Sequence, residues 1–312
     1  MEQRQLGSSG LRVSVVGLGC NQFRGKIDDA TVEATVGAAL DAGITLFDTA
    51  DIYGGRGGSE ESLGLALRGR RERALVATKF GMDMGDGAVA RGSRRYIRSA
   101  VEASLRRLQT DWIDLYQYHQ PDGVTPLDET LAALDELVDE GKVRYIGSSN
   151  FAAWQVVDAE WLARSAHGER FISAQNRYNL LERDAERELV PASLHCGVGI
   201  LPFYPLAAGV LTGKYSRGEP PPPESRLGGQ PHRAKEMLTD ATFDLLERLE
   251  DFARSRGRSL LEVAVAGLAS RPGVGSVIAG ATSPEQVIAN ARAGEWVLSA
   301  EDREALDAAL RD

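Results

Sequence analysis

Short runs of apolar and β-branched residues recur along the chain, and segments with a helical period separate them. Eight of these runs have the length and composition of strands buried in a sheet. They lie at residues 13–19, 44–50, 75–80, 114–119, 143–148, 171–176, 199–204 and 274–280. Six of the gaps carry an amphipathic helix pattern, at residues 29–42, 59–68, 94–108, 127–140, 152–163 and 183–194.

This alternation predicts parallel βαβ units, and eight such units close naturally into a (β/α)8 TIM barrel. The competing fold is a doubly wound open sheet that binds a dinucleotide after its first strand. The run from Gly17 to Cys20 lacks the third glycine of that fingerprint. We therefore predict a single barrel domain over residues 1–312.

Two segments lie outside the repeat. Residues 5–12 place turn residues between two short extended pieces, which predicts an N-terminal hairpin that could plug the bottom of the barrel. Residues 207–237 form a long segment after the seventh strand and include four consecutive prolines at 220–223. Long loops in compact domains are usually functional, and this one should lie on the C-terminal face, where barrel active sites lie.

Composition and charge narrow the partners. The 312 residues carry a net charge of −9, which disfavours nucleic acid and anionic membrane surfaces as partners. The N-terminus is polar and no apolar run approaches the length of a membrane span, so we expect a cytoplasmic protein. Two cysteines, Cys20 and Cys196, are too few and too far apart for a disulfide framework or a zinc site. We expect no metal.

Four residues with acid–base chemistry lie at or just after three consecutive strands. Asp48 ends the second strand and Tyr53 follows it, while Lys79 and His119 end the third and fourth strands. A lysine that points into a barrel is costly unless it is paired, and Asp48 is the expected partner. Such a group suits proton donation to a carbonyl oxygen, with Lys79 expected to lower the pKa of Tyr53 and His119 binding the same oxygen.

At these positions the chain resembles the aldo-keto reductase superfamily, most closely its bacterial members that act on sugars and small aldehydes. The resemblance rests on Phe-Asp-Thr-Ala-Asp-Ile-Tyr-Gly at 47–54, Thr-Lys-Phe-Gly at 78–81 and Tyr-Gln-Tyr-His-Gln-Pro-Asp at 116–122. It implies a nicotinamide-dependent oxidoreductase of aldehydes, ketones or sugars. It also implies Tyr53 as the general acid/base, with Asp48, Lys79 and His119 completing the tetrad.

The resemblance extends to cofactor residues. Gly-Ser-Ser-Asn at 147–150 and Gln-Asn-Arg-Tyr-Asn at 175–179 match segments of the family that hold the nicotinamide carboxamide. Phe203 takes the position that stacks on the nicotinamide, and Tyr204 stands where many members have serine. The complete set of implied cofactor residues is Gly19, Asp48, Ser149, Asn150, Gln175, Phe203, Leu206, Gly209, Leu211, Lys214, Arg226, Gly280, Thr282, Gln286 and Asn290.

The choice between NADP(H) and NAD(H) depends on the adenosine end. Members known for NADPH binding have lysine near Gly280 and arginine at the position of Gln286, and others have arginine at that of Thr282; this chain has none of these cations. Neutral side chains, together with Arg226 from the long loop, could still bind a 2′-phosphate. We expect NADP(H), and NAD(H) stays open.

The substrate residues are less legible. Asn21, Phe80, Gln120 and Phe151 are expected on loops around Tyr53 and His119, although the two phenylalanines would equally suit a core. The expected substrate is a small carbonyl compound or a sugar. Assembly into homo-oligomers stays open.

Two functions of other classes compete with the reductase. Potassium-channel β subunits share the fold and bind nicotinamide cofactor, so a regulatory subunit is one alternative. A Schiff-base aldolase with Lys79 as nucleophile is the other, and pairing with Asp48 counts against it.

Overall fold

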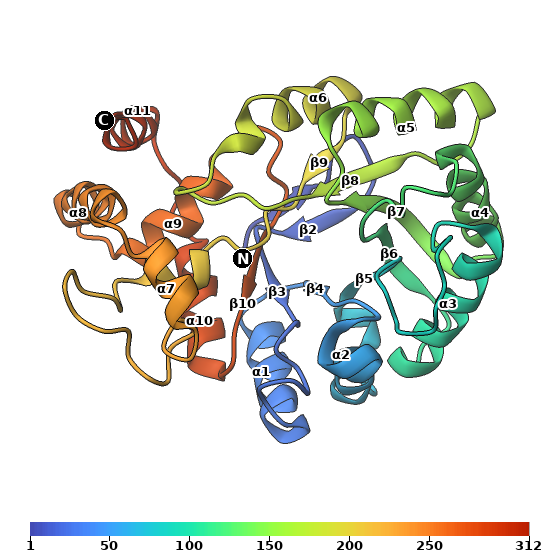
Figure 1. Ribbon diagram of the computed structural model, residues 1–312, viewed down its shortest axis with the longest axis horizontal. Coiled ribbons are helices and arrows are strands. Elements are labelled where there is room, and N and C mark those ends of the chain that lie inside the picture. Colours follow the sequence, from blue (N-terminus) through green and yellow to red (C-terminus); the bar gives the residue numbers. More distant parts are fainter. Residues whose placement is uncertain (312) are drawn as a thin grey trace.

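The computed structural model describes residues 1–311 and is built on an eight-stranded parallel sheet (Figure 1). The strands are β3 (Val16–Gly19), β4 (Leu46–Asp48), β5 (Leu75–Phe80), β6 (Ile113–Tyr118), β7 (Val143–Ser149), β8 (Phe171–Gln175), β9 (Gly199–Ile200) and β10 (Val277–Gly280). They follow the order β10-β3-β4-β5-β6-β7-β8-β9. Parallel bridges join Ile200 to Val274 and Phe203 to Ile278, so the two edges of the sheet meet. The fold is therefore the predicted (β/α)8 barrel.

Helices surround the strands (Figure 1). They are α1 (Asp29–Asp41), α2 (Tyr53–Ala66), α3 (Arg94–Leu108), α4 (Leu127–Asp139), α5 (Ala153–Ala166), α6 (Leu189–Cys196), α7 (Pro231–Met237), α8 (Asp240–Ser255), α9 (Leu260–Ala269), α10 (Pro284–Ala293) and α11 (Ala300–Ala309). Three short 3-10 helices are η1 (Arg71–Arg73), η2 (Asp184–Glu186) and η3 (Ala207–Thr212). Among residues 1–311, no helix has both the length and the apolar character needed to cross a membrane.

The helix α3 illustrates why the periodic segments fold as predicted. The Ser93 side chain accepts a hydrogen bond from the backbone of Tyr96 and so caps the first turn. Ile97, Val101 and Leu105 follow at spacings of one turn and are buried on the same face. This stripe packs the helix against the barrel.

The N-terminal hairpin is confirmed. β1 (Gln3–Gln5) pairs antiparallel with β2 (Arg12–Ser14), and the intervening turn carries Leu6. Leu6 is fully buried and packs with apolar side chains inside the barrel, among them Leu115 and Leu201. The hairpin thus closes the end of the barrel opposite the candidate site.

Several predicted elements differ in the structure. The strand expected at 199–204 is reduced to β9 at Gly199–Ile200, since Pro202 has no N–H for the sheet. The expected helix at 183–194 is divided into η2 and α6. Pro191 has no backbone N–H to donate to a preceding turn, so a new helix begins just before it and has the proline in its first turn. The expected strand at 13–19 is divided between the hairpin and β3. The long segment at 207–237 includes η3 and α7.

Candidate active site

A cavity of about 550 Å³ opens where the strands end at their C-terminal side, beneath the long segment after β9. Its walls include most of the site residues predicted from sequence. These are Gly19, Asn21, Asp48, Tyr53, His119, Ser149, Asn150, Gln175, Phe203, Leu206, Gly209, Lys214, Arg226, Gly280, Thr282, Gln286 and Asn290. Residues from nearly the whole length of the chain, Gly19 to Asn290, therefore line one continuous cavity.

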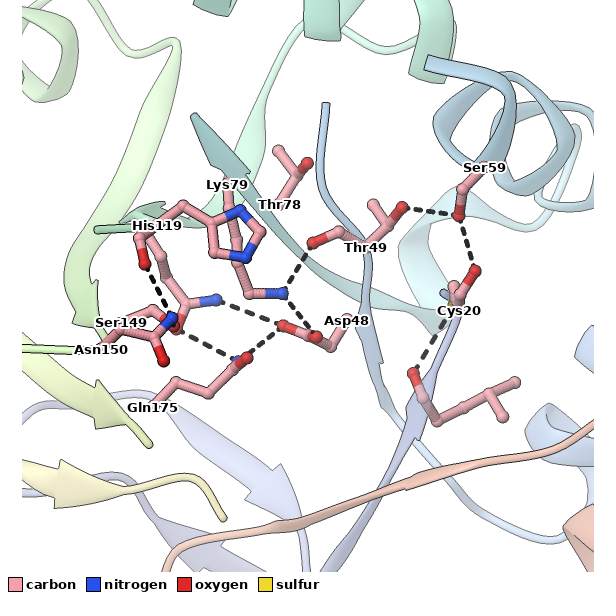
Figure 2. Close-up of polar contacts among 12 residues, drawn as sticks. Cys20, Asp48, Thr49, Ser59, Thr78, Lys79, His119, Ser149, Asn150 and Gln175 are labelled. Carbon is pink, nitrogen blue, oxygen red and sulfur yellow. Dashed lines mark hydrogen bonds and ion pairs between the residues drawn. The ribbon is translucent and has the colours of Figure 1, made fainter. Parts of the chain in front are cut away.

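A buried ion pair lies at the inner end of the cavity (Figure 2). Lys79 Nζ donates to Asp48 Oδ2 over 2.6 Å and to the backbone oxygen of Thr49 over 2.9 Å. The other oxygen of Asp48 accepts from Gln175 over 2.7 Å and from Gln117 over 3.2 Å. The carboxylate thus accepts hydrogen bonds from three side chains. A buried charge is stable only when it has partners of this kind.

Tyr53 follows β4 in a sharp turn that precedes the regular part of α2. Residues 54–57 have positive φ, so the chain bends before the helix proper begins. The Ser59 hydroxyl donates to the backbone oxygen of Cys20 and shares a 2.8 Å hydrogen bond with Thr49 (Figure 2). These bonds anchor the turn to β3 and β4 while Tyr53 lines the cavity.

The ionisation of Tyr53 and Lys79 follows from burial and from their mutual charges. Burial raises the pKa of Tyr53, and the charge of Lys79, whose Nζ lies 5.1 Å from the ring centroid, offsets only part of that increase. Lys79 therefore lowers the Tyr53 pKa as expected, but burial outweighs it, and the pKa lies above its ordinary value. Burial lowers the pKa of Lys79, but Asp48 and Tyr53 together raise it above its usual value. Tyr53 is a neutral phenol and Lys79 a cation at neutral pH.

His119 lies beside the tyrosine. The two rings meet edge to face, with centroids 5.7 Å apart and planes at 87°. Burial, and then the charge of Lys79, lowers the pKa of His119 to about 3. The imidazole is therefore neutral at physiological pH, and its buried Nδ1 has no hydrogen-bond partner among residues 1–311.

The residues expected to hold the carboxamide converge beside this group. Asn150 Nδ2 donates to the backbone oxygen of His119 over 3.0 Å and to Ser149 Oγ over 3.1 Å. Asn150 has a φ of 57°, a left-handed conformation that asparagine tolerates better than most residues. Gln175 is fixed by Asp48, so its amide has one defined orientation at the cavity wall.

The other end of the cavity has features that suit phosphate groups. The Lys214 side chain lies against Gly209, where an added Cβ would come within 3.0 Å of Nζ. The start of α10 contributes backbone N–H groups, and Ser283 caps it by accepting from the N–H of Gln286. Thr282 donates from its backbone N–H and from its hydroxyl to Gln286 Oε1. Within residues 1–311 the amide NH2 of Gln286 remains available to donate.

Several predicted residues do not line the cavity. Leu211 is fully buried in η3, and Gln120 lies outside the walls. Phe80 stacks on Tyr118 at 5.0 Å, and Phe151 packs edge to face on the same ring at 5.8 Å. Phe80 and Phe151 therefore do not surround the cavity, contrary to expectation. Their side chains belong to a buried aromatic cluster with Tyr118, away from the cavity. Lys79 is fully buried on Asp48 and does not itself line the cavity. Strand alternation explains Phe80, because Lys79 points inward to Asp48.

The sequence interpretation missed other residues of the site. Gln117 binds Asp48, and its position two residues before His119 on β6 was a usable signal, since both side chains point to the same face. Three cations, Lys26, Arg177 and Arg233, also line the cavity. No spacing pattern links them, because they come from three different loops or helices.

Comparison with known proteins identifies the family. The model of the aldo/keto reductase family matches residues 15–311. An uncharacterized oxidoreductase, YrpG, of Bacillus subtilis (strain 168) is 38% identical over 96% of this chain and 93% of its own. Aldo-keto reductase YhdN of the same organism is 35% identical over 100% of this chain and 94% of its own. A probable voltage-gated potassium channel subunit beta of Oryza sativa subsp. japonica is 36% identical over 94% and 91%. The chain therefore belongs to the aldo/keto reductase family.

Proposed function

We propose that the protein is a nicotinamide-dependent reductase of small aldehydes or ketones, including sugars, with Tyr53 as the general acid/base. Family membership supports an oxidoreductase. The observation that carries the finer proposal is the buried Asp48–Lys79 pair, which meets Tyr53 and His119 at one end of a cavity. The other end of that cavity has an ammonium beside a glycine and a helix N-terminus.

A nicotinamide dinucleotide fits the residues present. In the proposed arrangement Ser149, Asn150 and Gln175 hold the carboxamide, and Phe203 stacks on the ring. Gly209 and Lys214 contact the pyrophosphate, and the start of α10 contacts the adenosine ribose. The bound cofactor would supply the hydride.

The chain's own residues would manage the proton. Neutral Tyr53 donates its phenolic proton to the carbonyl oxygen, and the fixed charge of Lys79 stabilises the phenolate that remains. Neutral His119 is an N–H donor for the same oxygen and so orients the carbonyl. A charged Lys79 is a poor nucleophile, which counts against the Schiff-base aldolase.

Replacing the phenol tests this assignment. We expect Tyr53→Phe to lower kcat for aldehyde reduction by about 100-fold to 10,000-fold, since general acid catalysis contributes on this scale. Its Kd for NADPH, measured by fluorescence titration, should stay within a few-fold. Turnover close to that of the unmodified protein would refute the role of Tyr53.

We propose NADP(H) as the preferred cofactor, with NAD(H) as the alternative. The support is Arg226, a cation that forms no ion pair within residues 1–311 and lies in the same cavity as Thr282 and Gln286. Parallel titrations with NADPH and NADH test the preference. Gln286→Arg should strengthen the preference for NADPH by about tenfold, because a guanidinium binds phosphate with charge-assisted hydrogen bonds. Unchanged relative affinities would place the 2′-phosphate elsewhere.

A regulatory nicotinamide-binding subunit is the second candidate. It is favoured by the relatives in rice and Arabidopsis thaliana whose names are probable voltage-gated potassium channel subunit beta, at 36% and 34% identity. Tight cofactor binding without turnover of any carbonyl would favour this candidate over the reductase.

A further inference from the structure

Three arginines surround a single tyrosine ring at the rim of the cavity. The guanidinium carbons of Arg177, Arg226 and Arg233 lie 4.5, 5.7 and 5.2 Å from the ring centroid of Tyr204. Arg233 also donates to the Tyr204 hydroxyl over 2.6 Å. Tyr204 itself has a φ of 63°, a conformation uncommon for an aromatic residue, so its side chain is directed to this place by a strained backbone.

Two of these arginines, Arg226 and Arg233, line a vestibule that adjoins the catalytic cavity, whereas Arg177 lines only the catalytic cavity. This second hollow, of about 510 Å³, lies between the loop after β3 and the long segment after β9. It shares six wall residues with the catalytic cavity, namely Gln22, Lys26, Glu224, Ser225, Arg226 and Arg233. A ligand in one space can therefore extend into the other.

The charge of the vestibule is unusual for this protein. The whole chain carries a net charge of −9, yet the walls of the vestibule contribute three cations and one acid, Glu224. In residues 1–311 no acidic side chain forms an ion pair with Lys26, Arg226 or Arg233, whereas Arg177 is paired with Glu182 at 2.7 Å.

Like charges gathered on one ring repel one another, and the repulsion is relieved when an anion binds between them. Cation–π contacts with Tyr204 hold the guanidinium groups in place, so little side-chain entropy would be lost on binding. The vestibule is thus prepared for a carboxylate or a phosphate.

We propose that the vestibule binds an anionic group carried by the carbonyl substrate, so that the preferred substrates are aldehyde or keto acids or phosphate esters. This inference rests on the proposed reductase function. The proposed cofactor contacts already include Lys214 beside Gly209, the start of α10 and Arg226, which leaves Lys26 and Arg233 as the cations for the substrate. Lys26 instead follows Asn21 in the loop after β3, on the side expected to contact substrate.

Matched aldehydes of equal shape and different charge test the proposal. The measurement is the ratio of kcat/KM for 4-carboxybenzaldehyde to that for 4-methylbenzaldehyde, with saturating NADPH, at low and high ionic strength. We expect a ratio of about ten or more that falls with salt. Lys26→Met and Arg233→Met should each lower the ratio several-fold through a higher KM for the acid. Lys235→Met, on an exposed part of α7 outside both hollows, is the matched control and should leave the ratio unchanged.

Each other outcome has a defined meaning. A ratio near one in the unmodified protein would overturn the proposal. Variants that weaken binding of NADPH but not NADH would assign the anion to the cofactor's 2′-phosphate and also overturn it. Turnover of the neutral aldehyde tests the proposed function separately. If neither aldehyde is reduced, calorimetry with terephthalate on the NADPH-loaded protein decides: binding weakened by Lys26→Met supports the vestibule, and no binding refutes it.

Discussion

Asp48 ends β4 and Asp51 follows it three residues later; both are buried, with exposed fractions of 4% and 2%. Their surroundings are opposite. Asp48 accepts hydrogen bonds from Lys79, Gln175 and Gln117. Asp51 Oδ1 has no hydrogen-bond partner in the part of the chain that the structure describes. Burial, and then the charge of Glu60, raises the pKa of Asp51 to about 7.

Arg107, the cation that does most to lower the Asp51 pKa, is already engaged elsewhere. Arg107 donates to Glu60 over 2.6 Å, and Glu60 also accepts from Thr78 over 2.5 Å. The hydroxyl of Tyr116 is buried without a partner in the residues described. Equal burial therefore has different consequences: a complete set of partners holds a charge in the barrel, and an incomplete set favours the protonated acid.

The largest effect is expected from breaking the paired site. Asp48→Asn leaves Lys79 buried without its counter-charge, so we expect the free energy of unfolding to fall by about 3–5 kcal/mol. We also expect kcat/KM for aldehyde reduction to fall by about 100-fold or more, since the ammonium is no longer held beside Tyr53. Urea unfolding and steady-state kinetics measure these losses. A stable, active Asp48→Asn protein would contradict the conclusion that hydrogen-bonded partners make Asp48 differ from Asp51.

The unpaired site should respond in the opposite direction. Because the folded pKa of Asp51 lies above the unfolded value of about 3.9, the folded state binds the extra proton and stability falls as pH rises from about 4 to about 7. Asp51→Asn removes that loss. We expect the free energy of unfolding to increase by about 2–4 kcal/mol at about pH 8 and to change little at about pH 4. Asp158→Asn, on an exposed position of α5, is the control and should show no such pH dependence.

The smallest expected effect is that of His119 on the pH dependence of kcat/KM, and it distinguishes the titration of His119 from that of Asp51. Since the pKa of His119 is about 3, its protonation should change kcat/KM by less than about twofold between about pH 5 and pH 8. A pH–rate measurement checks this. A limb near pH 7 that disappears in Asp51→Asn and persists in His119→Gln belongs to the aspartate. A limb that disappears in His119→Gln would show that the histidine titrates.

Much of the fold could be predicted because its signals are local. The run at 75–80 coincides with β5, and the period at 94–108 coincides with α3. Interruptions were harder to place, as the division around Pro191 illustrates. Asp48, Lys79 and His119 were found because parallel strands bring their C-terminal ends to one rim of a barrel.

The remaining site residues depend on which face a side chain presents and on loop paths. Phe80 follows Lys79 directly and points to the opposite face, into contact with Tyr118. Arg177 and Arg233 are distant in sequence and meet only on the ring of Tyr204. No local pattern encodes such a meeting.

The sequence by itself determined the order of strands and helices, the barrel and the acid–base residues at the strand ends, because periodicity and strand alternation are short-range properties of the chain. Only the tertiary structure decided the direction of the Tyr53 pKa shift, the difference between Asp48 and Asp51, and the cationic vestibule. Each of these depends on desolvation and on charges brought together from distant segments, and both are set by packing in three dimensions.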